Sequence, residues 1–284
     1  MILVTGANGM VGSYVCDTFA QEQKNGLLAL TDIPEMDVTD HDKVFRLFDK
    51  HQPMVVLHLA AETNVDLCET EVDHAFRVNT MGTQNVALAC QRYDAVMVYI
   101  STGMVFDGKK DVVKTEFATP SPVNVYSKAK YEGEKIVQGL LDRYFIFRAG
   151  WMIGGGKKDK KFVGKMIELC KTKKIVQAVD DKFGSPTFAR DFLGGIKKVI
   201  QTGQFGLYHL VNSGVVSRYE IAKEIVRIMG VDVEVVPVSS DKFPLPAPRA
   251  ESEAMRNYKL DLMGINPMPK WEDSLEKYIK EIGG

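Results

Sequence analysis

The strongest constraint in this sequence is a regular alternation of apolar and amphipathic segments through its first half. Apolar runs rich in β-branched and aromatic residues cover residues 2–6, 27–32, 54–61, 96–102 and 144–151. Amphipathic stretches between them cover about 10–21, 40–50, 73–91 and 125–141, with Asp40 as an expected helix N-cap. Because this order is typical of βαβ units, we predict an α/β fold with a doubly wound parallel sheet covered on both faces.

The alternation breaks after Gly150, where a second pattern begins. Helices are predicted at 162–173, 187–201, 217–230 and 271–282, and short strands at 175–179, 206–212 and 233–238. This mixed order indicates a second, smaller lobe of α+β type.

The charge balance limits the partners of the chain. With 36 basic and 37 acidic residues the formal net charge is -1, so no global field draws the chain to nucleic acid or to an anionic membrane. No apolar stretch approaches the roughly 20 residues of a membrane span, and no basic region precedes the apolar run at the N-terminus. We therefore expect a cytoplasmic protein with neither nucleic-acid nor membrane partners.

The candidate metal ligands lack the spacing of a metal site. The cysteines, at positions 16, 68, 90 and 170, form no CxxC pair, and the five histidines show neither HxxxH nor HExxH spacing. We expect four reduced thiols and no bound metal.

The stretch TGANGMVG places three glycines between the first strand and the first helix. Gly6, Gly9 and Gly12 permit a tight turn and a close approach of backbone amides to a pyrophosphate, although a purely structural turn stays open. Asp32 ends the second strand about 20 residues later, where an acid accepts hydrogen bonds from ribose hydroxyls. Because a carboxylate repels a ribose 2′-phosphate, we expect NAD(H) to be favoured, with NADP(H) left open.

Three Tyr-x-x-x-Lys pairs occur in the chain, namely Tyr126/Lys130, Tyr131/Lys135 and Tyr219/Lys223. At this spacing on a helix the ammonium group lies on the same face as the phenol and stabilises its phenolate form. The first pair differs from the others because its helix follows the strand that ends in Ser101 and Thr102. Strand C-termini and the following helix N-termini meet at the ligand edge of a parallel sheet, so the first pair is the candidate for acid–base catalysis.

Together these motifs resemble the extended short-chain dehydrogenase/reductase superfamily, which acts largely on nucleotide-linked sugars. The resemblance rests on Gly6-x-x-Gly9-x-x-Gly12, on Ser101-Thr102 before Val105-Phe106, and on Tyr126-x-x-x-Lys130. Within the superfamily, VFDG (105–108), FGSPTFARD (183–191), GLYHLVNSG (206–214) and WEDSLEKYI (271–279) are similar to the dTDP-4-dehydrorhamnose reductase family. The similarity spans nearly the whole chain.

The resemblance implies a domain division. Residues 1–150 and about 186–213 are expected to form a dinucleotide-binding Rossmann domain, and residues 151–185 and 214–284 a substrate-binding lobe.

The resemblance also implies a role for individual residues. Tyr126 would donate a proton to the ketone oxygen of the sugar, Lys130 would lower the pKa of Tyr126 and bind the nicotinamide ribose, and Thr102 would hydrogen-bond the same oxygen. Gly103 and Trp151 would face the sugar, although a structural role of Trp151 at a domain junction stays open. The other implied cofactor contacts are Gly9, Met10 and Val11 at the pyrophosphate, Asp32 at the ribose, Asp37 and Val38 at the adenine, and Ala60, Ala61, Glu62 and Ser101 further along.

The sequence departs from the family beside the catalytic threonine. Where the reductases normally read Ser-Thr-Asp-Tyr, this chain has Gly103 and Met104. It therefore lacks the Asp-Glu pair that related 4,6-dehydratases use to eliminate water, whereas a small residue at position 103 resembles the 4-epimerases. Further along, Lys182 stands where a Gln is usual, Arg218 stands where a Trp is usual, and APRAESEAM (247–255) only loosely follows the family's substrate-domain segment.

The leading hypothesis is an NAD(P)H-dependent oxidoreductase that reduces a nucleotide-linked 4-keto-6-deoxy sugar, as in dTDP-rhamnose and polysaccharide biosynthesis. Two alternatives stay open. One is a nucleotide-sugar 4-epimerase that keeps one NAD, and the other is a non-catalytic NAD(P)-binding regulatory subunit. The expected partner is a nucleotide-sugar substrate, and a homodimer is left open.

Overall fold

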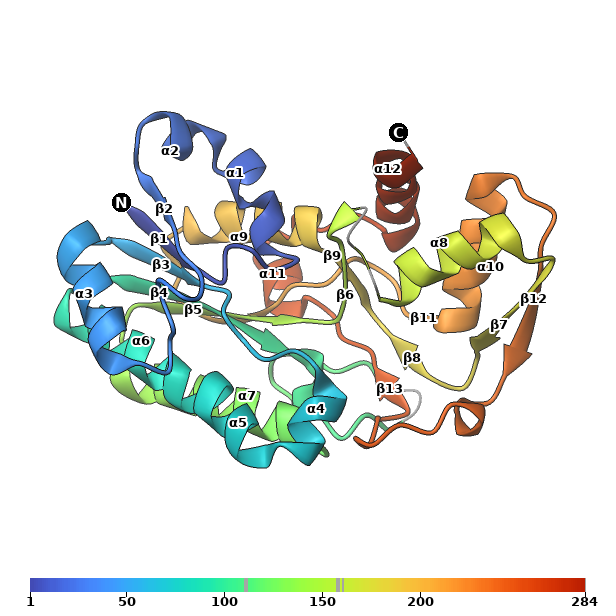
Figure 1. Ribbon diagram of the computed structural model, residues 1–284, viewed down its shortest axis with the longest axis horizontal. Coiled ribbons are helices and arrows are strands. Elements are labelled where there is room, and N and C mark those ends of the chain that lie inside the picture. The colour runs from blue at the N-terminus through green and yellow to red at the C-terminus, as the bar shows by residue number, and fades with distance from the viewer. Residues whose placement is uncertain (110–111, 157–158, 160, 284) are drawn as a thin grey trace.

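A six-stranded sheet with the strand order β10-β5-β4-β3-β1-β2 forms the centre of the first lobe (Figure 1). The structure is a computed structural model that describes residues 1–109, 112–156, 159 and 161–283. The strands are β1 (Ile2–Thr5), β2 (Leu28–Leu30), β3 (Val55–His58), β4 (Val96–Thr102), β5 (Tyr144–Ala149) and β10 (Gly206–His209). All neighbouring strands are parallel, and the chain reverses its direction across the sheet between β2 and β3. The predicted doubly wound parallel sheet is confirmed.

Helices cover both faces of this sheet (Figure 1). One face carries α3 (His41–His51), α5 (Val72–Phe76), α6 (Gly82–Arg92) and α7 (Val125–Leu140), and the other carries α1 (Val15–Thr18), α9 (Ala189–Ile200) and α11 (Tyr258–Leu262). Each face has its own apolar core, one around Phe48 and Val86 and the other around Phe147 and Phe192. The predicted N-cap of α3 is confirmed, since the Asp40 carboxylate accepts a hydrogen bond from the backbone N–H of Lys43.

Two predicted helices are interrupted. The segment 10–21 forms a 3-10 turn (η1, Gly12–Tyr14), then α1, and then α2 (Ala20–Lys24), because Phe19 leaves the helical conformation where its ring enters the core. The segment 73–91 contains a π-helical turn (η2, Arg77–Met81) between α5 and α6. Such turns are frequent at functional sites, and this one presents Asn79 to the loop after β3.

The second lobe is a small α+β unit (Figure 1). Helices α8 (Phe162–Thr172), α10 (Arg218–Met229) and α12 (Trp271–Gly283) pack with the parallel strands β7 (Ile175–Val179) and β12 (Glu234–Val238). Their shared core includes Ile167, Ile221, Ile225 and Leu275. The helices predicted in this half begin and end within two residues of the observed ones.

Short strands that the sequence pattern does not indicate join the two lobes. One three-stranded sheet has the order β11 (Val216–Ser217), β8 (Phe183–Gly184) and β13 (Ser252–Glu253), and β6 (Trp151–Ile153) pairs with β9 (Pro186–Phe188). Strands of two or three residues are too short to display an alternating pattern. The short helix α4 (Val65–Thr70) and α11 also lie outside the predictions.

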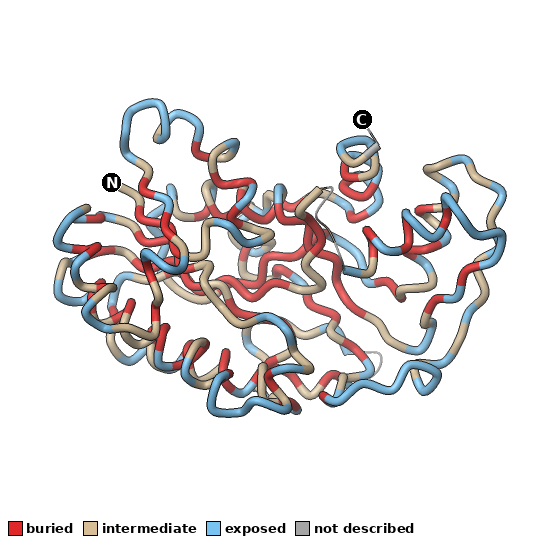
Figure 2. Tube along the Cα trace, viewed as in Figure 1, coloured by how far each residue is buried: buried red, intermediate tan, exposed pale blue. Residues whose placement is uncertain are grey.

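Burial follows this arrangement (Figure 2). The buried segments run along the central strands and the inward faces of the helices, and the outer loops and helix faces are exposed. Within the described part of the chain, no helix combines the length and the apolar composition needed to cross a bilayer.

Candidate active site

The carboxyl ends of the parallel strands open onto a cleft of about 1150 Å³ that both lobes line. Ligands bind at this edge of a doubly wound sheet, next to the point where the strand order reverses. All the site residues predicted from the sequence line the cleft, with the exception of Gly103.

The glycine turn after β1 has no room for side chains at two of its positions. A Cβ on Gly6, whose φ is +68°, would lie 2.7 Å from the backbone nitrogen of Ala60, and a Cβ on Gly12 would lie 2.7 Å from the carbonyl oxygen of Gly6. The backbone of this turn is therefore exposed to the cleft without a covering side chain, and Met10 and Val11 line the cleft beside it. Such a cradle fits the pyrophosphate of a dinucleotide.

Asp32 organises the neighbouring loop as well as lining the cleft. One carboxylate oxygen accepts a hydrogen bond from the backbone N–H of Asn8 at 2.8 Å, and the other accepts one from Ile33 at 2.8 Å. The acid at the end of β2 is thus tied directly to the glycine turn, which places its charge where a ribose would follow the pyrophosphate.

The adenine end of the predicted cofactor site is formed by Asp37 and Val38. The Asp37 carboxylate accepts hydrogen bonds from the Thr39 hydroxyl and backbone N–H, and these bonds lower the pKa of Asp37. Val38 is buried, and its side chain lies where Gly82 leaves space for it.

The loop after β3 is held by the π-helical turn. The Asn79 side chain accepts a hydrogen bond from the backbone N–H of Glu62 and donates one to its carbonyl, at 2.9 and 3.0 Å. This pairing fixes the segment that carries Ala60 and Ala61 along the cleft. Sequence reasoning missed Asn79, and the only signal was a polar residue in a stretch predicted as a regular helix.

Tyr126 lies in the first turn of α7. Asn124 caps this helix in a reciprocal capping box with Ser127, and the Glu69 carboxylate accepts a hydrogen bond from the backbone N–H of Val125 at 2.9 Å. The start of the helix is therefore fixed on both sides of Tyr126, which reaches the cleft together with Lys130 one turn later.

Ser101 and Thr102 are the last residues of β4, and their hydroxyl groups make different contacts. The Thr102 hydroxyl accepts a hydrogen bond from Met104 N–H at 3.2 Å and lines the cleft. Ser101 also borders the cleft, but its hydroxyl donates to the Glu134 carboxylate at 2.5 Å. Glu134 in turn binds the Arg148 guanidinium at 2.6 and 2.9 Å, so the end of β4 is attached to α7 and β5 by a buried ionic network.

Burial governs the protonation of the Tyr-Lys pair. Desolvation raises the pKa of Tyr126, and the nearby Cys68, Glu253 and Glu62 reinforce this rise, while Thr102 opposes it. Burial also lowers the pKa of Lys130 to about 7. The sequence argument expected Lys130 to lower the pKa of Tyr126, whereas desolvation is the largest contribution here and raises it.

The Lys130 ammonium group is nonetheless accommodated in the protein interior. It lies 4.1 Å from the centroid of the Tyr99 ring, and Glu134, one helical turn away, opposes the lowering of its pKa.

The other two Tyr-x-x-x-Lys pairs do not reach this cleft. Lys135 binds Glu132 on an exposed helix face, and Lys223 lies over the ring of Tyr219 on α10. The first pair, on the helix that follows the end of β4, is the one of the three that lines this cleft.

Gly103 does not face the substrate side of the cleft. It is buried, and a Cβ at this position would lie 2.6 Å from the terminal methyl of Met255. We expected Gly103 to face the sugar, and this expectation is corrected because Met255 covers Gly103. Met104 and Trp151 line the cleft instead.

Among the described residues of the second lobe, four cationic side chains line the cleft; they were missed as site residues, although two of them stood out as family departures. They are Lys161, Lys182, Arg218 and Arg249. The Arg218 guanidinium lies 4.4 Å from the Trp151 ring centroid and 4.9 Å from that of Phe162. Lys161 ends the lysine-rich stretch 154–161, whereas the other three cations come from distant segments, so no single run in the sequence indicates the cluster.

Comparison with known proteins decides the family. The model of the RmlD substrate binding domain matches residues 1–283. The chain belongs to the RmlD substrate-binding domain family. This family lies within the extended short-chain dehydrogenase/reductases, so the resemblance drawn from the motifs is confirmed.

Relatives in the RmlD family match over nearly their whole length. The spore coat polysaccharide biosynthesis protein SpsK of Bacillus subtilis is 32% identical over 99% of this chain and 97% of its own. The dTDP-4-dehydrorhamnose reductase of Mycolicibacterium smegmatis is 33% identical over 100% of this chain and 86% of its own. The solved structure of the Bacillus anthracis dTDP-4-dehydrorhamnose reductase in complex with NADP is 36% identical, with a TM-score of 0.93 over 99% of this chain and 98% of that one.

Proposed function

We propose that this chain reduces the C4 ketone of a nucleotide-linked 4-keto-6-deoxy sugar with NAD(P)H, as the dTDP-4-dehydrorhamnose reductases do. Membership of the RmlD family and the names of its relatives support this reaction. The observation that carries the proposal is that Thr102, Tyr126 and Lys130 line the same cleft as the uncovered glycine turn. A dinucleotide-binding turn beside a proton donor is the combination that a ketone reductase requires.

The proposed mechanism assigns the proton transfer to residues of this chain. A bound nicotinamide supplies the hydride that the C4 carbon accepts. Tyr126, which burial keeps protonated, donates its hydroxyl proton to the ketone oxygen, while the Thr102 hydroxyl hydrogen-bonds the same oxygen. The Tyr126 phenolate that remains is stabilised by the Lys130 ammonium group and regains its proton from solvent.

The second lobe supplies the charge that a nucleotide diphosphate requires. Three of its cleft-lining cations, Lys161, Lys182 and Arg218, would pair with the two phosphates, while Arg249 is bound to Asp66. Trp151, which lines the cleft, would contact the sugar. We propose that residues 1–150 and about 186–213 hold the cofactor and that most of the remainder holds the nucleotide sugar, with α11 packing on the first lobe.

Replacing the proposed proton donor tests this function directly. Tyr126→Phe removes the hydroxyl and retains the ring, so we expect NADH consumption with dTDP-4-dehydrorhamnose to fall by a factor of at least about 100. The affinity for NADH, measured by fluorescence titration, should change little. Tyr131→Phe removes a hydroxyl from the same helix outside the cleft and should leave turnover unchanged.

The same assay separates the alternatives. Undiminished turnover in Tyr126→Phe would contradict the proposed chemistry. An epimerase would retain NAD through purification, interconvert a nucleotide sugar without net NADH consumption and exchange cofactor slowly. A regulatory subunit would bind the cofactor and show no turnover.

Asp32 supports a finer proposal, that NADH is preferred over NADPH. Its carboxylate is tied to the glycine turn, so a ribose 2′-phosphate would face a negative charge that cannot easily move away. The Bacillus anthracis relative binds NADP, so the preference is expected to be a ratio of efficiencies, with NADPH still used.

The cofactor preference is tested by Asp32→Ala. Removing the carboxylate should shift the ratio of kcat/KM values toward NADPH by about 10-fold, because about 1.4 kcal/mol of repulsion is removed. Glu35→Gln is the matched control, since Glu35 lies on the same loop with its side chain more than half exposed and paired with Lys50. An equal ratio in wild type and Asp32→Ala would show that Asp32 does not select the cofactor.

A further inference from the structure

Glu253 enters the cleft from the small sheet between the lobes. It lies on β13 opposite Gly184 of β8, in the register that pairs Ser252 with Phe183. A Cβ on Gly184 would lie 2.7 Å from Cζ2 of Trp151, so the indole lies directly on this glycine. The absence of a side chain at position 184 therefore brings Trp151 next to Glu253.

The groups around Glu253 support its ionised form against the effect of burial. Burial raises its pKa, and the Trp151 indole, Arg218 and Arg249 oppose this rise. Arg249 is already bound to Asp66 at 2.9 Å, and Arg218 stacks on Trp151. Glu253 also lies close enough to Tyr126 to raise the pKa of that phenol. The carboxylate therefore lies near both Trp151 and the proposed proton donor.

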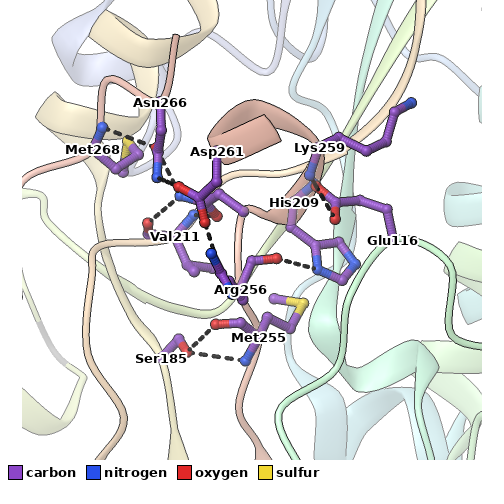
Figure 3. Close-up of polar contacts among 11 residues, drawn as sticks. Glu116, Ser185, His209, Val211, Met255, Arg256, Lys259, Asp261, Asn266 and Met268 are labelled. Atoms are coloured by element: carbon purple, nitrogen blue, oxygen red, sulfur yellow. Dashed lines mark hydrogen bonds and ion pairs between the residues drawn. The ribbon is translucent and has the colours of Figure 1, made fainter. Parts of the chain in front are cut away.

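The segment that carries Glu253 is held firmly at both ends (Figure 3). The Ser185 hydroxyl accepts a hydrogen bond from Met255 N–H and donates one to its carbonyl, both at 3.1 Å. The Arg256 guanidinium binds Asp261 at 2.7 Å, and the Arg256 carbonyl lies 3.1 Å from Nδ1 of His209. On the other side, Ser252 N–H donates to the Gly108 carbonyl. Glu253 is thus presented by a preorganised backbone.

The same segment occupies the space beside Gly103. A side chain on residue 103 would begin where the end of the Met255 side chain lies, so an acid at position 103 would require Met255 to shift. Two residues earlier, Glu253 places a carboxylate in the cleft. The segment therefore covers position 103 with Met255 and supplies an acid to the cleft from position 253.

We propose that Glu253 is a specificity-determining residue that accepts hydrogen bonds from hydroxyl groups of the sugar, in place of an acid after Thr102. This inference rests on the proposed function, because it assigns the sugar part of the substrate to this end of the cleft. A carboxylate is an acceptor only, and its bonds to hydroxyl groups are charge-assisted, which suits a polyhydroxylated ring. Binding of the nucleotide and of the diphosphate should not depend on Glu253.

The test compares a sugar nucleotide with the nucleotide alone. Glu253→Gln preserves the shape of the side chain, and we expect it to raise the KM for dTDP-4-dehydrorhamnose about 10-fold. The kcat should fall by a smaller factor than the KM rises. The inhibition constant of dTDP should stay within about 2-fold of the wild-type value. Glu253→Ala should raise the KM at least as much. Glu251→Gln is the matched control, because Glu251 is exposed on the same segment and does not line the cleft.

Two results would overturn the inference. An unchanged KM in Glu253→Gln, with wild-type turnover present, refutes it and leaves the proposed function intact. A parallel loss of dTDP and sugar-nucleotide affinity also refutes it, because it indicates a general disturbance of the cleft. Calorimetric titration with dTDP-rhamnose and with dTDP makes the same comparison without turnover, so a failure of the proposed reaction is distinguished from a failure of this inference.

Discussion

At the scale of single residues, the buried Glu134 binds the end of β4 and influences the charge of Lys130 in the proposed catalytic pair. Its carboxylate binds Ser101 and Arg148 and opposes the lowering of the Lys130 pKa, which burial brings to about 7. Lys130 is therefore protonated below about pH 7 and loses its charge as the pH rises through that value. The proposed stabilisation of the Tyr126 phenolate depends on the protonated form.

The pH dependence of reduction follows from this titration. We expect kcat/KM of the wild type to fall as the pH rises through about 7. Glu134→Gln should move this fall to lower pH, because it removes the negative charge that supports protonated Lys130. The pH profile should be measured at low temperature, since Arg148 loses its paired charge in the variant. Glu132→Gln removes an exposed charge from the same helix as a control. A profile that is identical in Glu134→Gln and wild type would refute this role.

At the scale of secondary structure elements, the start of α7 links stability to the site. Asn124 caps the helix two residues before Tyr126, and its side-chain amide also donates to the Pro248 carbonyl at 3.0 Å. This one side chain therefore connects the helix start with the segment leading to Arg249 and Glu253. The cap of α3 by Asp40 is a similar side-chain-to-backbone bond that lies outside the cleft.

The two caps provide a matched pair of variants. Asn124→Ala and Asp40→Ala should each lower the free energy of unfolding by about 1 kcal/mol, measured by urea denaturation. Only Asn124→Ala should also lower kcat, by about 3- to 10-fold, because a small displacement of Tyr126 spoils proton transfer. Equal kcat values in both variants would show that the cap stabilises the helix without positioning the tyrosine.

At the scale of the whole molecule, the cleft exists only because segments distant in the sequence meet. The glycine turn lies near residue 10, the Tyr-Lys pair near residue 128, and the acid of β13 at residue 253, yet all line one cleft. The chain passes between the lobes several times, through β6, β9, β11 and β13, and the last of these passages carries Glu253. Substrate selectivity is thus proposed to reside in the connections between the lobes.

The local pattern was sufficient for the parallel sheet, most long helices and the glycine turn, and it singled out the Tyr126/Lys130 pair that lines the cleft. These features depend on hydrophobic periodicity and on motifs whose spacing is set by one turn or one strand, so neighbouring residues contain the information. The contacts of Asn79, the packing of Met255 against Gly103 and the position of Glu253 were decided by tertiary structure alone. Each joins segments far apart in the chain through side-chain packing or two-residue strands, and the direction of the pKa shift of Tyr126 likewise depends on burial that only the folded chain creates.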